Sequence, residues 1–427
     1  MANTSRVTVR RGHSLRTFEA FGNRSYRLLW PANFLAYICR WMQLTLLGWL
    51  VLELTDSPFL VALVGFFGML PLLILGMVGG VLADRVNKHR ILILTQVISC
   101  VAAFVMVLLL QTGAIRFWHA YVVMGCTGIG WALDMPSRRS AIHDLVGRAG
   151  VTNAIAMDSV GMQASRMIGP ALAGALITTV DVLGGYVVVS AIYVVAIALI
   201  AAVNLPPADR SRLGLSNVLG NLVEGFRYVR RDNVLVATVL VTILMNLLLF
   251  PYAQMIPVIA RDVLLIGPGL MGTLLGAEGL GALFGAIGVA SIGVTRSHGR
   301  LYIGGSMLGL VMLLCFSIVR WYYVALPVLF VLGFGTSGFS TMQSTLVMLR
   351  SREEMRGRAL GVISLAIGAG PLGALMVGAI ASMSSTPFAI GFDAVLGIVS
   401  LSLVVLLMPS LWRQPMVSDE RVPKAEG

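Results

Sequence analysis

Three charged side chains stand inside long apolar stretches of this sequence. Arg40 and Arg166 are the basic ones, and Glu278 is the only carboxylate that we place well within such a stretch. An ionisable group in apolar surroundings normally faces an internal water-filled path or pairs with an opposite charge. A carboxylate whose surroundings alternate between wet and dry can take up and release a proton. We therefore expect Glu278 to exchange protons, and the two arginines to contact a ligand or to form ion pairs.

The apolar stretches that must position these residues number twelve. A helix crosses a bilayer with about 20 apolar residues, whereas a strand of a barrel needs about 10. The stretches have the length of helices and cover 29–52, 59–82, 91–111, 117–135, 160–180, 184–204, 234–259, 269–293, 301–319, 322–346, 359–382 and 387–409. Hydrophobic residues make up 57% of the 427 residues and charged residues 12%, against about 25% charged in soluble domains. These features predict an all-α polytopic membrane protein.

Polar segments divide the chain into two halves of six helices each. The expected parts are an N-terminal segment 1–28, a six-helix bundle 29–204, a linker 205–233, a second six-helix bundle 234–409 and a tail 410–427. Apolar spacing in 215–228 predicts a surface helix within the linker. The similar segments "RMIGPALAGALI" and "AIGAGPLGALMVGAI" indicate a weak parallel repeat of the two halves. In membrane proteins built this way, the solute site lies between the halves.

Lysine and arginine fall mostly on one side of the predicted membrane. The side that holds both termini and the linker receives 26 of them, and the opposite side receives 3. Cytoplasmic loops carry the excess of positive charge in membrane proteins. We therefore expect both termini to lie in the cytoplasm.

The composition also argues against several other classes of protein. The net charge of +12 is explained by membrane topology, so it does not indicate nucleic-acid binding. All four cysteines lie inside apolar stretches, which argues against an exported disulfide framework. We find no metal-site spacing of His, Cys and Glu, no nucleophile–base arrangement, and no glycine-rich phosphate loop before either lysine. We therefore expect no enzyme activity, no catalytic residues, no metal and no cofactor.

A charged motif, "GGVLADRVNKHRIL", stands between the second and third stretches. It resembles the loop signature of the major facilitator superfamily, Gly-x-Leu-x-Asp-Arg-x-Gly-Arg-Arg-Arg. Asn87 replaces the usual glycine of the signature, and Asn tolerates a left-handed backbone. The stretches "GWLVLELTDSPFLVALVG" and "NAIAMDSVGMQASRMIGPALAG" are similar to the bacterial efflux branch that includes the enterobactin exporter and the transmembrane secretion effectors. The matching motif residues are Gly80, Leu82, Asp84, Arg85, Lys88 and Arg90.

The resemblance implies roles in gating for this motif. In the family, the aspartate, here Asp84, meets the start of the eleventh helix and holds the cytoplasmic side shut. The basic residue four places later, Lys88, would reach an acidic residue at the cytoplasmic end of the fourth helix, where Asp134 is available. The alternative role for Arg85 and Arg90 is to anchor the topology by positive charge.

The resemblance also implies which helices surround a central cavity, namely the first, fourth, seventh and tenth. The cavity candidates are Arg40, Trp131, Arg166, Asn246, Phe250 and Gln343. The alternative for the neutral residues is a packing or interhelix hydrogen-bonding role, and for Arg40 a structural ion pair. Gly169, Pro170 and Gly174 resemble the motif of antiporters in the fifth helix, although the family's motif is richer in glycine. Gly281, Gly285 and Gly288 predict close helix packing.

We predict a secondary transporter that exports a small amphipathic molecule, such as a drug, siderophore or metabolite, by alternating access. The coupling candidate is Glu278, which implies protons as the second partner. The expected location is the bacterial plasma (inner) membrane, and the expected state is a monomer. Two alternatives stay open, an importer of a small solute on the same fold and a non-transporting receptor or lipid-handling protein.

Overall fold

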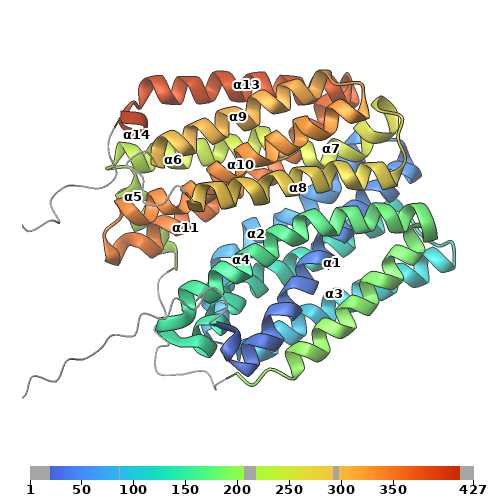
Figure 1. Cartoon of the computed structure of the whole chain (residues 1–427), viewed down its shortest axis with the longest axis horizontal. Helices are drawn as coiled ribbons and strands as arrows, with labels where there is room; N and C mark the ends of the chain where they lie inside the picture. Colours follow the sequence, from blue (N-terminus) through green and yellow to red (C-terminus); the bar gives the residue numbers. More distant parts are fainter. Residues whose placement is uncertain (1–19, 86, 206–217, 292–297, 414–427) are drawn as a thin grey trace, which may run out of the picture.

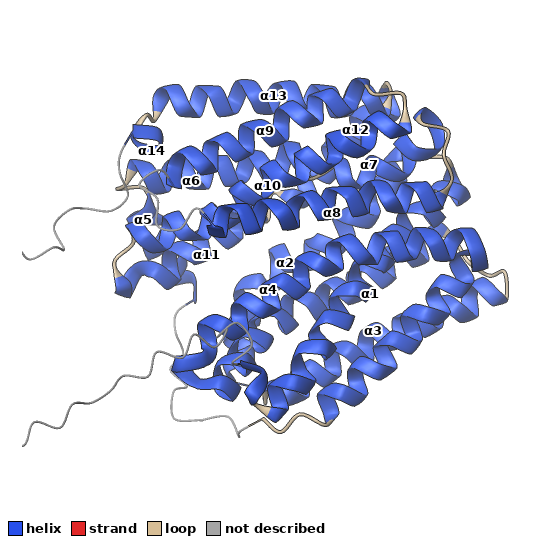
Figure 2. Cartoon of the chain, in the orientation of Figure 1, coloured by secondary structure: helices blue, strands red, loops and turns tan. Residues whose placement is uncertain are grey.

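The computed structural model describes residues 20–85, 87–205, 218–291 and 298–413, without the side chains of 76–85 and a few others. Within these ranges every regular element is helical (Figure 2). The α-helices are α1 (Arg24–Thr55), α2 (Pro58–Arg85), α3 (Lys88–Gln111), α4 (Phe117–Ala201), α5 (Val218–Val229), α6 (Asn233–Leu244), α7 (Tyr252–Val258), α8 (Pro268–Ser291), α9 (His298–Ile318), α10 (Tyr322–Arg350), α11 (Arg356–Ile367), α12 (Gly370–Met383), α13 (Thr386–Leu407) and α14 (Ser410–Arg413). Two π-helical turns, η3 (Met245–Leu249) and η4 (Ile259–Val263), and a 3₁₀ turn, η5 (Glu353–Met355), complete the described elements.

The described helices account for the twelve predicted crossings. Ten helical stretches are long and apolar enough to span a membrane. One of them, Gly150–Ala201 within α4, holds two crossings, because the backbone leaves helical geometry at Val180 and Asp181. The part of α4 before Gly147 supplies the remaining crossing, since Gly147 has a φ of 67° and separates it from the next.

The helices form two bundles that follow one another in the sequence. Helices α1 to α4 make up one bundle, and α6 to α13 make up the other (Figure 1). The linker helix α5, the short α14 and the start of α1 lie at one end of the molecule, as an even number of crossings in each half requires. The ribbons of the two bundles lie further apart at this end than at the opposite one (Figure 1).

The outer surface of the bundles is apolar. Phe104 is 55% exposed, Val194 58% and Val399 59%, and many other large apolar side chains are similarly open. Such a surface is unfavourable in water but suits the hydrocarbon interior of a bilayer. The described starts of α1, α3, α6 and α13 carry polar caps instead. The side chain of Asn23 accepts from the backbone of Ser25 at the start of α1, which satisfies amide donors that a helix start leaves free.

The seventh crossing is interrupted rather than continuous. It runs from α6 through η3, α7 and η4 and contains Pro251 and Pro257. In η3 the amide of Phe250 donates to the carbonyl of Met245, five residues earlier. Such π turns widen a helix locally and occur frequently at functional sites. This one places Asn246 and Phe250 beside the interface between the bundles.

The predicted helix in the linker exists as α5, and it packs on the end of the second bundle. Glu224 Oε1 accepts from Arg358 Nη1 at 2.7 Å, and Leu222 and Val229 pack against the start of α11. Phe226, 59% exposed, faces away from this contact. The linker is therefore attached to the start of the eleventh crossing.

Candidate functional site

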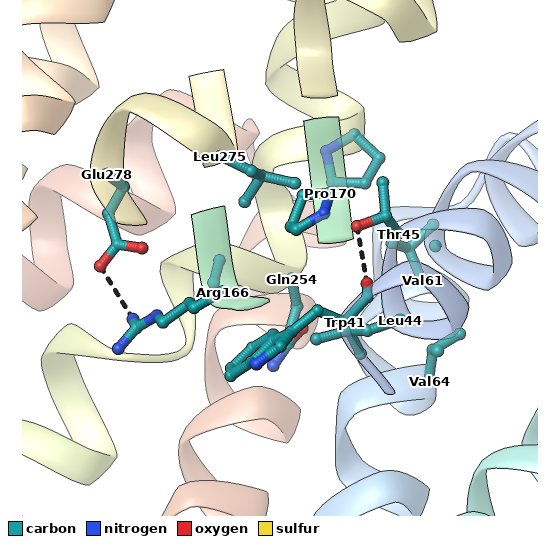
Figure 3. A pocket seen from close by; sticks show the side chains of 13 residues that line it. Trp41, Leu44, Thr45, Val61, Val64, Arg166, Pro170, Gln254, Leu275 and Glu278 are labelled. Atoms are coloured by element: carbon teal, nitrogen blue, oxygen red, sulfur yellow. Dashed lines mark hydrogen bonds and ion pairs between the residues drawn. The ribbon is translucent and has the colours of Figure 1, made fainter. Parts of the chain in front are cut away.

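An ion pair joins the two bundles (Figure 3). Nη2 of Arg166 in α4 lies 2.8 Å from Oε1 of Glu278 in α8. The side chain of Glu278 is 5% exposed and that of Arg166 is 22% exposed. Removing one partner of such a shielded pair leaves the other charge uncompensated. Any movement that separates α4 from α8 must therefore neutralise or rehydrate Glu278.

Glycines bring α4 and α8 close enough for this pair to form. A Cβ atom on Gly174 would clash with the carbonyl oxygen of Pro268, and one on Gly272 would clash with that of Pro170. A Cβ on Gly279 would meet the backbone of Met167 at 2.8 Å. The predicted motif of the fifth helix thus forms a close contact between bundles. Its first glycine, Gly169, packs instead against α1 at Trp41.

The predicted glycine stripe of α8 also makes close contacts, on its other face. A Cβ on Gly281 or Gly285 would clash with backbone or side-chain atoms of α10, which confirms the predicted packing. Gly288 has more room, with its nearest neighbour at 3.9 Å. Helix α8 is therefore held between α4 and α10.

A cavity of about 190 Å³ lies between the bundles beside the ion pair. Both bundles contribute to its wall, which consists of Arg40, Trp41, Leu44, Gly65, Gly68, Met69, Met124, Arg166, Asn246, Phe250, Pro251, Ala253, Gln254 and Gly370. A second pocket adjoins it through Trp41, Arg166 and Gln254 and contains Glu278 (Figure 3). The arrangement places a mostly apolar chamber next to the charged pair.

Four of the six predicted cavity residues line this chamber, namely Arg40, Arg166, Asn246 and Phe250. Trp131 lies behind Arg40, whose Cζ atom is 4.5 Å from the centre of the indole ring, and lines a smaller pocket. Gln343 does not line the chamber but donates to Thr242 Oγ1 at 2.8 Å within the second bundle. Gln343 therefore has the alternative role that we gave for the neutral residues, an interhelix hydrogen bond.

Sequence reasoning missed Trp41 and Gln254 in the cavity wall. Gln254 follows Asn246 and Phe250 at steps of four residues, so the helical spacing of that face was a usable signal. Trp41 is the direct neighbour of Arg40, and its ring lies 5.5 Å from the Arg166 guanidinium. No spacing signal in the sequence marks Trp41.

The gating motif is only partly described. The side chains of Asp84 and Arg85 and the surroundings of Gly80 lie outside the described part of the structure, and so does the predicted contact of Asp84 with the eleventh helix. Arg90 is exposed. Asn87 does not adopt a left-handed backbone, since its φ is −58°. Its side chain caps α3 by accepting from the amide of His89.

The predicted pairing of Lys88 with Asp134 is wrong. Lys88 Nζ lies 2.5 Å from Asp144 Oδ2. Asp134 is instead buried and paired with Arg138 one turn further along α4. The expected fourth stretch ended at 135, but α4 stays helical to residue 146 and so carries Asp144 to Lys88.

A buried polar network surrounds Asp134 inside the first bundle. Arg138 bonds both Asp134 and Asn33 of α1. Asn33 Nδ2 in turn donates to Asp158 at 2.8 Å, and Tyr37 Oη donates to the same carboxylate at 3.0 Å. All of these partners belong to α1 and α4, so the network stabilises the first bundle rather than the contact between bundles.

A second ion pair joins the bundles at the end away from the linker. Arg261 Nη1 donates to Asp56 Oδ1 at 2.7 Å and to the carbonyl of Leu52 at 3.2 Å. Asp56 ends α1 with a φ of 50°, and Arg261 lies in η4 at the end of the seventh crossing. We call Arg261, Asp56 and the Leu52 carbonyl the outer clasp.

Glu278 is not the only carboxylate deep in a span, contrary to our expectation. Asp393 in α13 is 1% exposed, and its Oδ1 has no hydrogen-bond partner in the described part of the chain. The sequence already places Asp393 inside the predicted stretch 387–409, as it places Glu278 inside 269–293. It lies within the second bundle, away from the cavity wall.

The described residues contain no group of three or more His, Cys, Asp or Glu side chains that could hold a metal ion. The site therefore consists of an apolar chamber, two arginines and one carboxylate that bridges the bundles.

A family model described as a transmembrane secretion effector matches residues 15–426. The multidrug efflux pump Tap of Mycolicibacterium fortuitum is 26% identical over 381 residues, covering 85% of this chain and 90% of that protein. The staphyloferrin A transporter of Staphylococcus aureus is 22% identical over 361 residues, covering 82% and 88% respectively. A crystal structure of a POT peptide transporter matches with a TM-score of 0.74 at 11% identity, over 93% of this chain and 96% of that one, which shows the fold alone. The chain therefore belongs to the transmembrane secretion effector family, in the efflux branch of the major facilitator superfamily.

Proposed function

We propose that this protein exports a small amphipathic molecule by alternating access, with bundles 29–204 and 234–409 as the moving units. The observation that carries the proposal is the chamber whose wall comes from both bundles. A site built in this way can open to either side when the bundles rock against each other. The direction is taken from a relative that is a multidrug efflux pump by name.

We further propose that export is coupled to protons, as an antiport. Glu278 bridges the bundles and is shielded in the present arrangement by Arg166. When the bundles separate, the carboxylate loses its partner and its surroundings change, so that it can exchange a proton in step with the movement. Glycine contacts between α4 and α8 bring the two helices close enough for Arg166 and Glu278 to pair. Protonation of Glu278 is thereby linked to the arrangement of the bundles.

The cellular setting follows from the same proposal. The excess of basic residues on the side of the termini and linker supports a cytoplasmic position for both ends. We place the protein in the bacterial plasma membrane, where the proton gradient is available. The chamber is complete within one chain, which supports a monomer as the working unit.

Deleting the gene and measuring the intracellular accumulation of a solute panel tests the function. Export predicts that at least one amphipathic solute accumulates more in the deletion strain than in the parent strain. Lower accumulation of a solute would instead support import. No change across a broad panel would contradict transport.

The energy source is tested with purified protein in liposomes under an imposed pH gradient. Proton antiport predicts that a solute found in the cell assay moves against the direction of proton flow. Addition of a protonophore should stop this movement. Transport that continues unchanged after the protonophore would contradict the coupling.

A further inference from the structure

The chamber between the bundles carries more positive than negative charge. Arg40 and Arg166 line it, and no carboxylate lines it among the described residues. Glu278, in the adjoining pocket, compensates Arg166. The guanidinium of Arg40 therefore adds an uncompensated charge to the chamber.

Within the described part of the chain, the contacts of Arg40 leave most of its hydrogen-bond donors free. Its ring partner is Trp131, and its hydrogen bond to the carbonyl of Gly68 is long, at 3.5 Å. One carboxylate, that of Asp134, shares a small pocket with Arg40, but it accepts hydrogen bonds from Arg138 and from Thr95 Oγ1. A guanidinium presents five donors in a planar fork, which fits the two oxygens of a carboxylate or phosphate group.

The remainder of the wall is suited to an apolar body. Its apolar part includes Leu44, Met69, Met124, Phe250 and Pro251, and Asn246 and Gln254 are its neutral polar members. Methionine side chains adapt to ligands of different shape. A ligand that fills this chamber thus needs an apolar part against these residues and a polar group that reaches Arg40.

We propose that Arg40 binds an acidic group of the substrate, so that the exported molecule is an amphipathic organic anion. This inference rests on the proposed function and names the class of its substrate. An acidic oxyanion group would use the free donors of Arg40 through charge-assisted hydrogen bonds. A cationic amphipath would instead add a second positive charge in surroundings of low dielectric, where repulsion is stronger than in water.

Binding of matched fluorescent probes to the purified full-length protein tests the proposal. Dansylglycine carries a carboxylate, dansylamide is neutral, and dansylcadaverine carries an amine on a longer chain. We expect the wild-type protein to bind dansylglycine most tightly and dansylcadaverine most weakly. Competition by 1-naphthyl phosphate and by 1-naphthoate then distinguishes phosphate from carboxylate as the preferred acidic group.

Variants of Arg40 test whether this residue causes the preference for the anionic probe. Arg40→Gln is expected to weaken dansylglycine binding by about tenfold or more, the effect of losing a charged hydrogen bond. Binding of dansylamide should stay unchanged, and Arg40→Lys should keep part of the preference for the anion. Arg139→Gln, which removes an exposed arginine of α4, is the matched control and should behave as the wild type.

Three results would each overturn the proposal. The wild-type protein could bind dansylcadaverine more tightly than the other probes, or it could fail to bind dansylglycine. The Arg40→Gln variant could also keep the full affinity for dansylglycine. The first of these measurements needs no variant, so misfolding of Arg40→Gln does not hide the answer. If cationic solutes accumulate in the deletion strain while anions do not, export stands and the anionic substrate class fails.

Discussion

At the scale of residues, two buried carboxylates have opposite surroundings. Glu278 pairs with Arg166 across the bundles, whereas Asp393 lies within one bundle and has an unpartnered oxygen in the described region. A group whose partner is lost during transport can couple a proton to the movement, and a group that keeps its surroundings cannot. The two residues therefore offer a matched comparison.

Glu278→Gln is expected to abolish transport driven by a pH gradient while substrate binding is retained. The amide keeps a hydrogen-bond acceptor for Arg166 but does not exchange a proton. Asp393→Asn should keep gradient-driven transport, because the amide replaces an isosteric group outside the cavity. Liposome transport and probe binding, measured on both variants, check this prediction.

The double variant Arg166→Gln/Glu278→Gln separates coupling from structure. The single variant Glu278→Gln leaves the charge of Arg166 uncompensated. If the pair only stabilised the fold, the double variant would remove that charge as well and would restore the gradient-driven transport that the single variant lacks. We expect the double variant to fold, as judged by its Tm, and still to lack coupled transport. Restored coupling would contradict the role of Glu278.

At the scale of elements, the sequence predicts where the helices lie better than it predicts which helices pack against each other. The crossings follow from the length of apolar stretches, and the face of the seventh helix follows from the spacing of Asn246 and Phe250. The Arg166–Glu278 pair joins residues 112 positions apart. Periodicity places each residue on a face of its own helix, but it carries no information on which faces meet. The pairing of Lys88 failed for a related reason, since apolar length marks the membrane crossing and not the helical extension beyond it.

The contact between α4 and α8 gives a prediction of its own. Gly174→Ala places a methyl group against the backbone of α8, and overpacking of this kind costs about 1–3 kcal/mol. We expect a lower Tm and reduced transport, because the displaced helices hold Glu278 away from Arg166. The control is Gly304→Ala in α9, where an added Cβ meets nothing within 4 Å. Since alanine favours helix over glycine, this variant should keep or raise the Tm. An equal loss in both variants would contradict a specific contact at Gly174.

At the scale of the whole molecule, the bundles are joined at one end and lie apart at the other (Figure 1). The outer clasp holds the end away from the linker, and α5 is attached to the second bundle at the linker end. Alternating access requires that the clasp opens and that the linker end closes in the same cycle. The transport cycle therefore depends on a contact far from the chamber.

Cross-linking the clasp tests this dependence. In a background with its four native cysteines replaced by serine, the changes Asp56→Cys and Arg261→Cys place two thiols across the bundles. A short bifunctional thiol reagent should fix the outer end closed and abolish transport, while dansylglycine binding persists because the cross-link keeps the bundles in the arrangement that forms the chamber. Cleaving a reducible reagent should restore the transport of the uncross-linked double variant. The single variant Asp56→Cys, treated in the same way, controls for modification alone. Transport that survives complete cross-linking would show that the bundles do not separate at the clasp, and would contradict rocking of the two bundles as the mechanism.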